Sequence, residues 1–291
     1  MMSAKLTPNT ATSRSASNRY PRLIRDNNRL LGLWLPVVIV ACWSLMALFG
    51  NMLELHPNDI ALDSILRRPG MDSLFGYDDL GRPVLDRILI GARTSLLVAM
   101  WVVCLSAIAG TVIGLLAAYF GNWVDRVISL VIDIFMAFPG LLLAIALAGI
   151  MGPGLDNVVI ALSVVGWVGF ARLTRAQVLS IKHREHVQAA MALGAGSVSI
   201  MFKHILPLAM APLIVEASFG IASVVIAEAG LSFLGLGIQP PEASWGNMIR
   251  DGARYLLVAP HMVLAPGLVL MLVVLAVNML GDRLRDYLNK V

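Results

Sequence analysis

Long apolar runs separated by polar stretches fill the chain from residue 30 onward. A membrane-spanning helix needs about 20 mostly apolar residues, because it rises about 1.5 Å per residue across a hydrocarbon core of about 30 Å. Six runs come near or exceed that length: Leu30–Leu53, Thr94–Tyr119, Val127–Ile150, Asn157–Leu173, Leu208–Gly230 and Val258–Leu280. The pattern therefore predicts six spans, of which the fourth is the shortest.

Composition supports a membrane protein. Of the 291 residues, 58% are hydrophobic and 14% charged, and the mean hydropathy is +0.80, whereas a soluble chain of this length needs more polar surface. Backbone groups inside lipid must pair within their own segment, so runs this long predict helices. The alternation of barrel strands is missing from the sequence. The sequence thus predicts an all-α integral membrane protein in contact with lipid.

Several other classes of site are disfavoured. The net charge is +4, but the basic residues lie beside apolar runs and form no basic face, so nucleic acid is not an expected partner. Cys42 and Cys104 fall inside apolar runs and are interpreted as small buried hydrophobes. His183 and His186 are three residues apart on a loop away from the predicted spans. This placement argues against a role as nickel ligands.

The basic residues predict the orientation, because cytoplasmic loops carry an excess of Lys and Arg. With six spans and the N-terminal tail inside, fifteen of the 22 basic residues lie inside and seven outside. Both termini are therefore expected in the cytoplasm. The predicted organisation is a polar, flexible tail (1–29), the first span with an extracytoplasmic loop (30–93), a five-helix core (94–282) and a second tail (283–291).

Three connecting loops are long: Glu54–Arg93 and Leu231–Leu257 outside, and Arg172–Pro207 inside. The second outer loop is apolar but is interrupted by glycines and by Pro240-Pro241. It is expected to begin as helix and then to re-enter the membrane or lie along the interface, since irregular backbone at that depth needs protein or water beside it. An amphipathic interfacial turn is the alternative.

The inside loop predicts a helix over Glu185–Ala195. Its face would hold Val187, Ala190, Met191 and Gly194, with Glu185 at the positive end of the helix dipole and Gly194 permitting a sharp stop. Ser197 is expected to cap a second short helix, Val198–Ile205, and Pro207 to begin the next span. Small residues on the exposed side suit a docking partner. An ordinary helical hairpin is the alternative.

Ionisable residues within spans are costly and are therefore functional candidates. Asp133, Glu216 and Glu228 are such residues, and Asp133 precedes a break at Phe138-Pro139 in the third span. Asp133, Pro139, Glu216 and Glu228 are accordingly the candidates for a translocation path. Hydrogen bonds between helices, without substrate contact, are the alternative role.

Catalytic motifs are missing from the sequence. It contains no Gly-x-x-x-x-Gly-Lys-Ser/Thr loop, no Gly-x-Ser-x-Gly and no His-Glu-x-x-His. The chain is therefore not expected to be an enzyme or to have catalytic residues, and energy for transport would come from a partner. An ATP-independent secondary transporter is the rival interpretation. It would be favoured by an inverted repeat, and none is visible.

The segment Glu185–Ala190, followed by Gly194 and Ile205–Pro207, resembles the EAA loop of ABC-importer permeases. The wider chain resembles the second (C-type) permease subunit of dipeptide, oligopeptide and nickel importers. The matching segments are Gly76–Arg82, Gly91–Leu96, Phe138-Pro139, Gly230–Gly237, Gln239–Pro241, Ser244–Gly246 and Gly281–Asp286.

The resemblance implies the type I importer permease fold in the bacterial inner membrane, with dipeptides or oligopeptides as substrates. Nickel, glutathione or antimicrobial peptides are alternatives. It implies a homologous permease subunit, two cytoplasmic ATPase subunits that bind ATP and Mg²⁺, and an extracytoplasmic solute-binding protein. This chain would bind no cofactor. The ATPase-coupling residues would be Glu185, Val187, Gln188, Ala189, Ala190, Gly194 and Pro207.

Some positions depart from the family pattern. Gln188 stands where the first Glu of the EAA signature is usual, which leaves Glu185 as the acidic residue of the loop. Tyr77 and Pro83 replace a usual threonine and a usual acidic residue in the outer loop. Met191 stands where a basic residue is frequent. These changes bear on the docking surfaces expected at the two ends.

Overall fold

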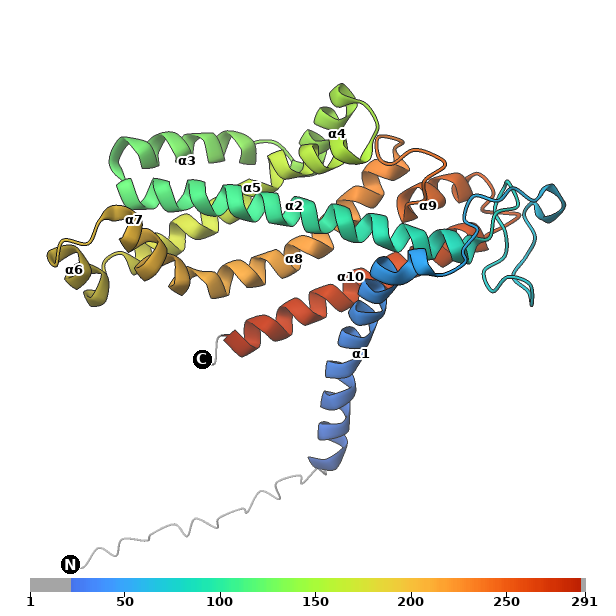
Figure 1. Ribbon diagram of the computed structural model, residues 1–291, viewed down its shortest axis with the longest axis horizontal. Helices are drawn as coiled ribbons and strands as arrows, with labels where there is room; N and C mark the ends of the chain where they lie inside the picture. Colours follow the sequence, from blue (N-terminus) through green and yellow to red (C-terminus); the bar gives the residue numbers. More distant parts are fainter. Residues whose placement is uncertain (1–21, 289–291) are drawn as a thin grey trace, which may run out of the picture. The chain divides into compact units, whose positions relative to one another are not determined.

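The computed structural model describes residues 22–288, whose regular elements are all helices, joined by loops (Figure 1). The chain divides into residues 1–34 and 35–291. The described part of the first unit is the beginning of α1, and the remaining helices belong to the second unit. The helices are α1 (Arg22–Phe49), α2 (Val84–Phe120), α3 (Asn122–Met136), α4 (Gly140–Met151), α5 (Leu155–Ile181), α6 (Glu185–Ala192), α7 (Ser197–Ser199), α8 (Leu206–Phe233), α9 (Trp245–Ala253) and α10 (His261–Leu288).

The helices confirm the all-α membrane class. Among the described residues, four helices are long and apolar enough to cross a membrane: Val84–Phe120, Leu155–Ile181, Ser197–Phe233 and His261–Leu288. The pair α3 and α4 makes a fifth if the two are counted together. The apolar stretch Trp34–Phe49 of α1 is shorter than a full span. The sixth span therefore stays a prediction.

The third predicted span is a bent pair of helices. Helices α3 and α4 meet at 85° across Ala137–Pro139. Pro139 has no N–H to donate, and the residue before a proline avoids helical backbone, so the break falls at the predicted Phe138-Pro139. A single span over Val127–Ile150 is thus wrong in shape, because the chain turns sharply at its middle.

Several helices extend beyond the apolar runs that predicted them. Helix α2 begins at Val84 instead of Thr94, and α5 continues to Ile181, so Arg87 and Arg93 belong to α2 and Arg172 and Arg175 to α5 instead of to loops. Two of these charges have acidic partners: Arg87 approaches Asp78 and Arg175 pairs with Asp125. Helix α1 begins at Arg22 and α10 runs to Leu288, so both enter the segments predicted as tails. The remainder of those segments, 1–21 and 289–291, lies outside the described residues.

Helix α2 packs along α5 and α8. Its contact with α5 is close because Gly110 and Gly114 face the α5 backbone: a Cβ at either glycine would collide with the carbonyl of Trp167 or Ala171. Small residues that let backbones approach are the usual means of helix association where lipid removes the hydrophobic driving force. This contact fixes the bundle on which the sites below are built.

The segment after α8 folds back onto the protein. Helix α9 packs against α8 and α10, and Ser244 caps it by accepting a hydrogen bond from the Asn247 N–H at 3.2 Å. Trp245 is fully buried and its Nε1 donates to the Ile88 carbonyl at 3.0 Å. The irregular backbone predicted for Leu231–Leu257 is therefore supported by protein.

The two cysteines are placed differently from the prediction. Cys42 and Cys104 are both exposed on the chain, so the expectation of buried positions is wrong. An apolar run predicts contact with apolar surroundings. In a membrane protein, lipid can supply those surroundings as well as the core can.

Candidate functional site

Helix α6 is a single short helix that ends at a glycine. Gly194 has a φ of +80°. The Ala195 N–H donates to the Ala190 carbonyl at 3.1 Å and the Gly194 N–H to Met191 at 3.0 Å, which is the hydrogen-bond pattern of a Schellman stop. Glycine reaches this backbone conformation without strain. The predicted stop at Gly194 is confirmed, although the helix ends at Ala192 and not Ala195.

One side chain anchors α6 to the bundle. Val187 is fully buried and packs in a cluster with Ile181, Ile200 and Ile205. Ala190 is half-buried, whereas Met191 and Gly194 of the predicted face are exposed. The contact with the bundle is therefore narrower than the predicted stripe.

Helices α6 and α7 lie at the same end of the bundle (Figure 1). Large apolar side chains are exposed on and beside them. Leu193 is 88% exposed, and Val198 and Phe202 are more than half exposed. Glu185, Gln188 and Ala189 are exposed beside them. We call Met191, Leu193, Val198 and Phe202 the end patch. Large apolar groups that are exposed on one short segment are typical of an interaction surface.

Gln188 ties α6 to the end of α5. Its Nε2 donates to the Lys182 carbonyl at 3.0 Å, and the Lys182 Nζ donates to the Ala118 carbonyl at 2.9 Å. These bonds satisfy carbonyls at the ends of α5 and α2 that lack helical partners. A glutamate at position 188 could not donate this bond when ionised. The departure from the family pattern therefore has a structural role here.

The chain from Ser197 to Phe233 forms one continuous helix. Residues Ile200–Ile205 are π-helical, and the Leu206 N–H donates to the Met201 carbonyl, five residues back. Pro207 follows at the start of α8, as predicted, where its missing N–H is tolerated. Ser197 does not cap this helix: Gly196 occupies the N-cap position and the serine is the first helical residue.

A bidentate ion pair braces this end of the bundle. The Asp125 carboxylate receives Nε and Nη2 of Arg175 at 2.5 and 2.7 Å, joining the start of α3 to α5. Bidentate Arg–carboxylate pairs fix geometry as well as add energy. The sequence does not reveal this pair, because the partners are 50 residues apart and no local pattern links them.

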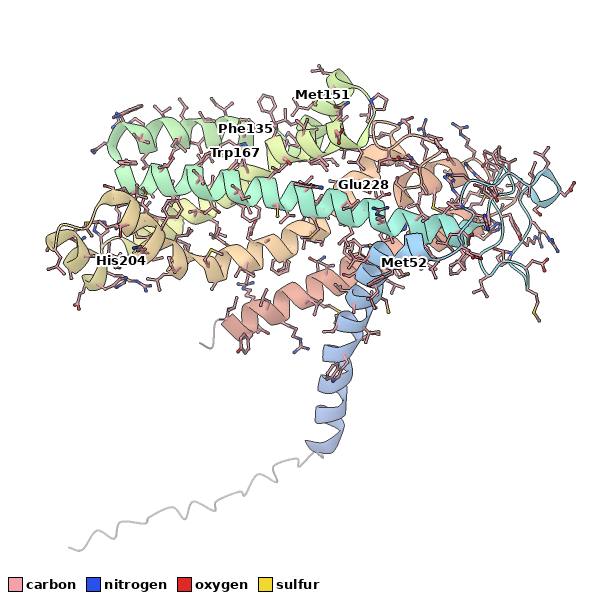
Figure 2. The ribbon with its side chains drawn as sticks, viewed as in Figure 1. Met52, Phe135, Met151, Trp167, His204 and Glu228 are labelled. Carbon is pink, nitrogen blue, oxygen red and sulfur yellow. The ribbon has the colours of Figure 1, made fainter. Side chains whose placement is uncertain are left out.

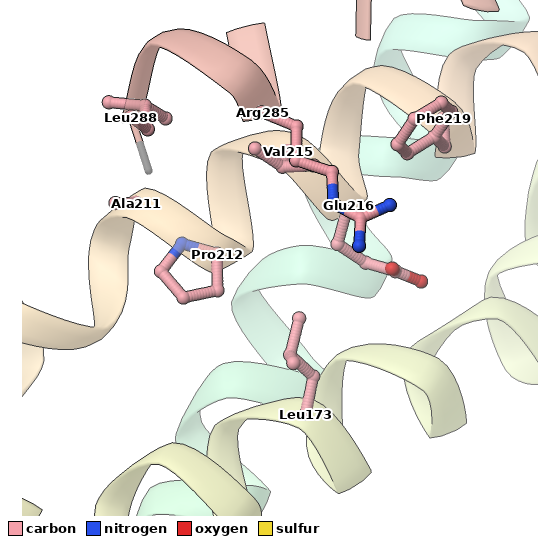
Figure 3. A pocket seen from close by; sticks show the side chains of 8 residues that line it. All are labelled: Leu173, Ala211, Pro212, Val215, Glu216, Phe219, Arg285 and Leu288. Atoms are coloured by element: carbon pink, nitrogen blue, oxygen red, sulfur yellow. The ribbon is translucent and has the colours of Figure 1, made fainter. Parts of the chain in front are cut away.

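The four translocation-path candidates lie in different places. Glu216 is half-buried and lines a cavity between α5, α8 and α10 (Figure 3). Asp133 is exposed near the end of α3, and Pro139 is exposed at the N-cap of α4. Glu228 is fully buried within the bundle (Figure 2). The structure does not bring the four together.

Glu228 is held by one hydroxyl group from its own helix, α8, and one from α2. Its carboxylate receives Ser232 Oγ at 2.8 Å and Ser95 Oγ, from α2, at 3.3 Å. Buried polar groups of this kind cost free energy unless they are hydrogen-bonded. This arrangement matches the alternative role left open by the sequence, a hydrogen bond between helices.

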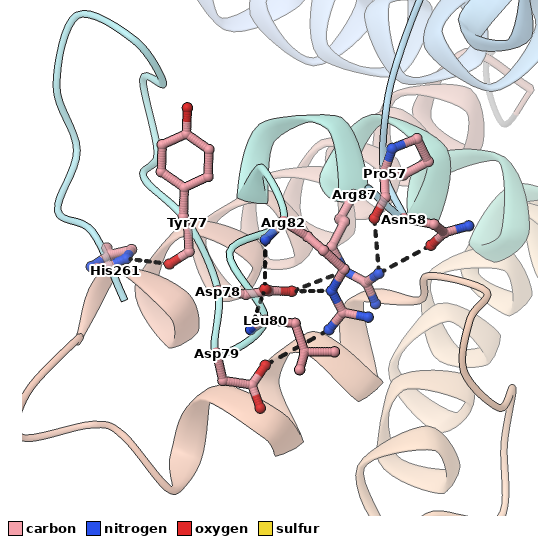
Figure 4. A network of polar contacts seen from close by, with 9 residues as sticks. All are labelled: Pro57, Asn58, Tyr77, Asp78, Asp79, Leu80, Arg82, Arg87 and His261. Carbon is pink, nitrogen blue, oxygen red and sulfur yellow. Dashed lines mark hydrogen bonds and ion pairs between the residues drawn. The ribbon is translucent and has the colours of Figure 1, made fainter. Parts of the chain in front are cut away.

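A buried network of charges organises the outer loop (Figure 4). Asp78 accepts the backbone N–H groups of Leu80 and Arg82 at 2.9 Å and the Arg82 Nε at 2.6 Å. Arg87, from α2, approaches the same carboxylate at 3.7 Å and donates to the Pro57 carbonyl at 3.1 Å. These bonds attach the loop to the first turn of α2.

One further contact and one shifted pKa belong to this network. The His261 Nε2 lies 3.1 Å from the Tyr77 carbonyl, which links the loop to the start of α10. Burial, together with the neighbouring Asp78 charge, raises the pKa of Asp79 above its ordinary value, while Arg82 partly offsets this. The loop motif that carried part of the resemblance is therefore a folded structure tied to two spans.

Among residues 22–288, no group of three or more His, Cys, Asp or Glu side chains is placed to hold a metal ion. His183 and His186 are both exposed on the segment around α6.

Residues 110–290 match the family described as the binding-protein-dependent transport system inner membrane component. The chain belongs to this family. The matched range contains α6, the end patch, the continuous helix after Gly196 and the Glu216 cavity. The permease is therefore the membrane subunit of an ABC importer, as its EAA-like segment indicated.

Relatives and a solved structure agree with this assignment. The permease is 41% identical, over 93% of its length and 88% of the relative, to a dipeptide transport system permease protein of Alkalihalophilus pseudofirmus. It is 42% identical, over 78% of its length and 75% of the relative, to a glutathione transport system permease protein of Pectobacterium atrosepticum. A chain of an inward-facing MetNI methionine ABC transporter superposes with a TM-score of 0.57 at 21% identity, covering 70% of the permease and 96% of that chain. This superposition supports the type I importer permease fold.

Proposed function

We propose that the permease imports dipeptides or oligopeptides, forming half of a translocation pathway with a homologous permease subunit. The observation that carries this is its 41% identity over nearly its whole length to a dipeptide permease. Glutathione is a second candidate cargo, because a glutathione permease is similarly related. Glutathione is itself a small peptide, so the two candidates share one chemistry.

The proposed complex includes two cytoplasmic ATPase subunits and an extracytoplasmic solute-binding protein. The ATPase subunits would hold ATP and Mg²⁺, and this chain would bind no cofactor. The family's description names a binding protein, which supports the second partner. Both termini of the permease would lie in the cytoplasm, on the side of α6.

Helix α6 and the end patch are the proposed docking site for an ATPase subunit. Four exposed apolar side chains beside Gly194 offer a surface that a partner can cover. Val187 and Gln188 hold α6 on the bundle. Movement of the docked α6 would be passed to the helix that runs without a break from Ser197 to Phe233. ATP-driven closure of the ATPases would then rock α8 and give alternating access.

Uptake by the reconstituted complex tests the cargo. Proteoliposomes containing both permeases, the ATPases and the binding protein would be supplied with ATP and, in turn, labelled dialanine, trialanine, glutathione and Ni²⁺. ATP-dependent accumulation of the alanine peptides supports the proposal. Accumulation of Ni²⁺ without peptide uptake would contradict it. Accumulation of glutathione alone would select the second candidate.

A further inference from the structure

The cavity that contains Glu216 has two opposite charges on its wall. Its volume is about 460 Å³ and it lies between α5, α8 and α10. Pro212 and Phe219 from α8 and Leu173 from α5 form apolar wall, and Arg285 of α10 lines it together with Glu216 (Figure 3). This size falls within the range of about 300–1,000 Å³ found for small-molecule sites.

Two glycines shape this cavity. A Cβ at Gly169 of α5 would lie 3.3 Å from the Glu216 Oε1, so the glycine leaves room for the carboxylate against α5. A Cβ at Gly281 of α10 would lie 3.0 Å from the Phe219 ring, so α10 packs closely on α8 there. Arg285 follows Gly281 by four residues, which places it one turn along α10 on the same face. The close contact thus sets the distance across the cavity.

The two charges are not paired with each other. Among the described residues, neither Glu216 nor Arg285 takes part in an ion pair within 4.0 Å. A carboxylate and a guanidinium in one cavity, with apolar side chains lining the rest of its wall, match a small molecule that carries both a cation and an anion. Arginine suits a carboxylate because its planar fork donates two parallel hydrogen bonds.

We propose that this cavity is a peptide subsite of the translocation pathway. The peptide ammonium group binds at Glu216, its terminal carboxylate binds at Arg285, and its side chains lie against Phe219 and Pro212. Arg285 lies near the end of α10, so the subsite belongs to the half of the permease nearer the cytoplasm. The inference rests on the proposed import of peptides.

Charge-neutral and charge-exchange variants test the subsite. Glu216→Gln and Arg285→Gln each remove one charge, and the double variant Glu216→Arg with Arg285→Glu keeps one charge of each sign. Arg283→Gln is the matched control, because Arg283 is exposed on the same end of α10 and does not line the cavity. Uptake of dialanine per ATP hydrolysed would be measured in proteoliposomes with saturating loaded binding protein. All rates are normalised to assembled complex.

Each single neutral variant should lower uptake per ATP by about 2- to 5-fold, the scale of one partly exposed charge contact. Arg283→Gln should match the wild type, and the exchanged pair should recover most of the loss. The concentration of loaded binding protein giving half-maximal uptake, and the melting temperature, should be unchanged. A merely structural role would instead lower the melting temperature of the neutral variants.

Two results would overturn the subsite. One is dialanine uptake at the wild-type level in both neutral variants. The other is an exchanged pair that is as poor as the neutral variants. Failure of the proposed function looks different, because the wild-type complex itself would then carry no peptide. If the wild-type complex carries dialanine and the neutral variants carry it equally well, the subsite is contradicted and the proposed import of peptides is not.

Discussion

Replacing Leu193 by aspartate is the sharpest perturbation of the proposed ATPase docking surface. Leu193 follows α6, is 88% exposed, and belongs to the end patch. Because its side chain makes little contact within the permease, the substitution should leave the fold intact. Leu257 offers a matched control, since it is 99% exposed and lies on the loop between α9 and α10.

The expected magnitude follows from burial. Fully burying a leucine side chain contributes about 1.5–3 kcal/mol, so losing that contact at an interface weakens association by about 2 kcal/mol. Such a loss corresponds to about a 30-fold rise in the dissociation constant. Placing a carboxylate in the covered apolar patch adds a desolvation cost, so this value is a lower bound.

The assay is titration of purified ATPase subunits onto the permease pair in detergent, with ATPase co-purification as a second readout. Leu193→Asp should weaken binding about 30-fold or more, whereas Leu257→Asp should leave it unchanged. Melting temperatures of both variants should equal that of the wild type. Undiminished ATPase binding by Leu193→Asp would refute the docking surface. Equal losses in the two variants would show that the effect is not local.

Three other predictions concern Gln188, Glu228 and Asp79. Gln188→Glu removes the hydrogen bond to the Lys182 carbonyl. It should lower the melting temperature by a few degrees, because one hydrogen bond contributes about 1 kcal/mol to stability. Gln188→Ala should give a similar loss. Glu228→Ala should leave the Ser95 and Ser232 hydroxyls without their acceptor and lower the free energy of unfolding by about 1–3 kcal/mol. Glu228→Gln should keep most of the stability. Equal losses in the two variants would contradict a hydrogen-bonding role. The raised pKa of Asp79 means that its contribution to stability is present below its unfolded pKa and is lost as pH rises through its folded pKa. Asp79→Asn should therefore stabilise the protein at pH 7 relative to wild type and not at pH 3, as read from melting temperatures.

Much of the helical architecture follows from local sequence. Runs of apolar residues are sufficient to predict α2, α5, α8 and α10, because length and hydropathy alone decide whether a segment can cross lipid. Pro139 marks the break between α3 and α4, and Gly194 marks the end of α6, because each residue acts on its own backbone.

Features that depend on distant partners could not be predicted in this way. The part of helix α5 beyond Leu173 carries Arg175, which pairs with Asp125, and no pattern near Arg175 reveals that partner. The Glu216 cavity likewise requires Arg285 from α10 and the space left by Gly169. Glu216 was identified by its cost in a membrane, whereas Arg285 was assigned to a tail beyond the last span. A charge near a helix end can reach water at little cost, so its position alone does not mark it as a functional candidate.

Energy coupling is the central claim, and the most direct measurement is dialanine uptake with and without the ATPase subunits. Proteoliposomes would hold the two permeases alone or the complete complex, each with loaded binding protein and with or without ATP. The account predicts accumulation only in the complete complex with ATP, and no accumulation when Leu193→Asp prevents docking. Accumulation by the permeases alone, driven by an ion gradient or by none, would contradict it.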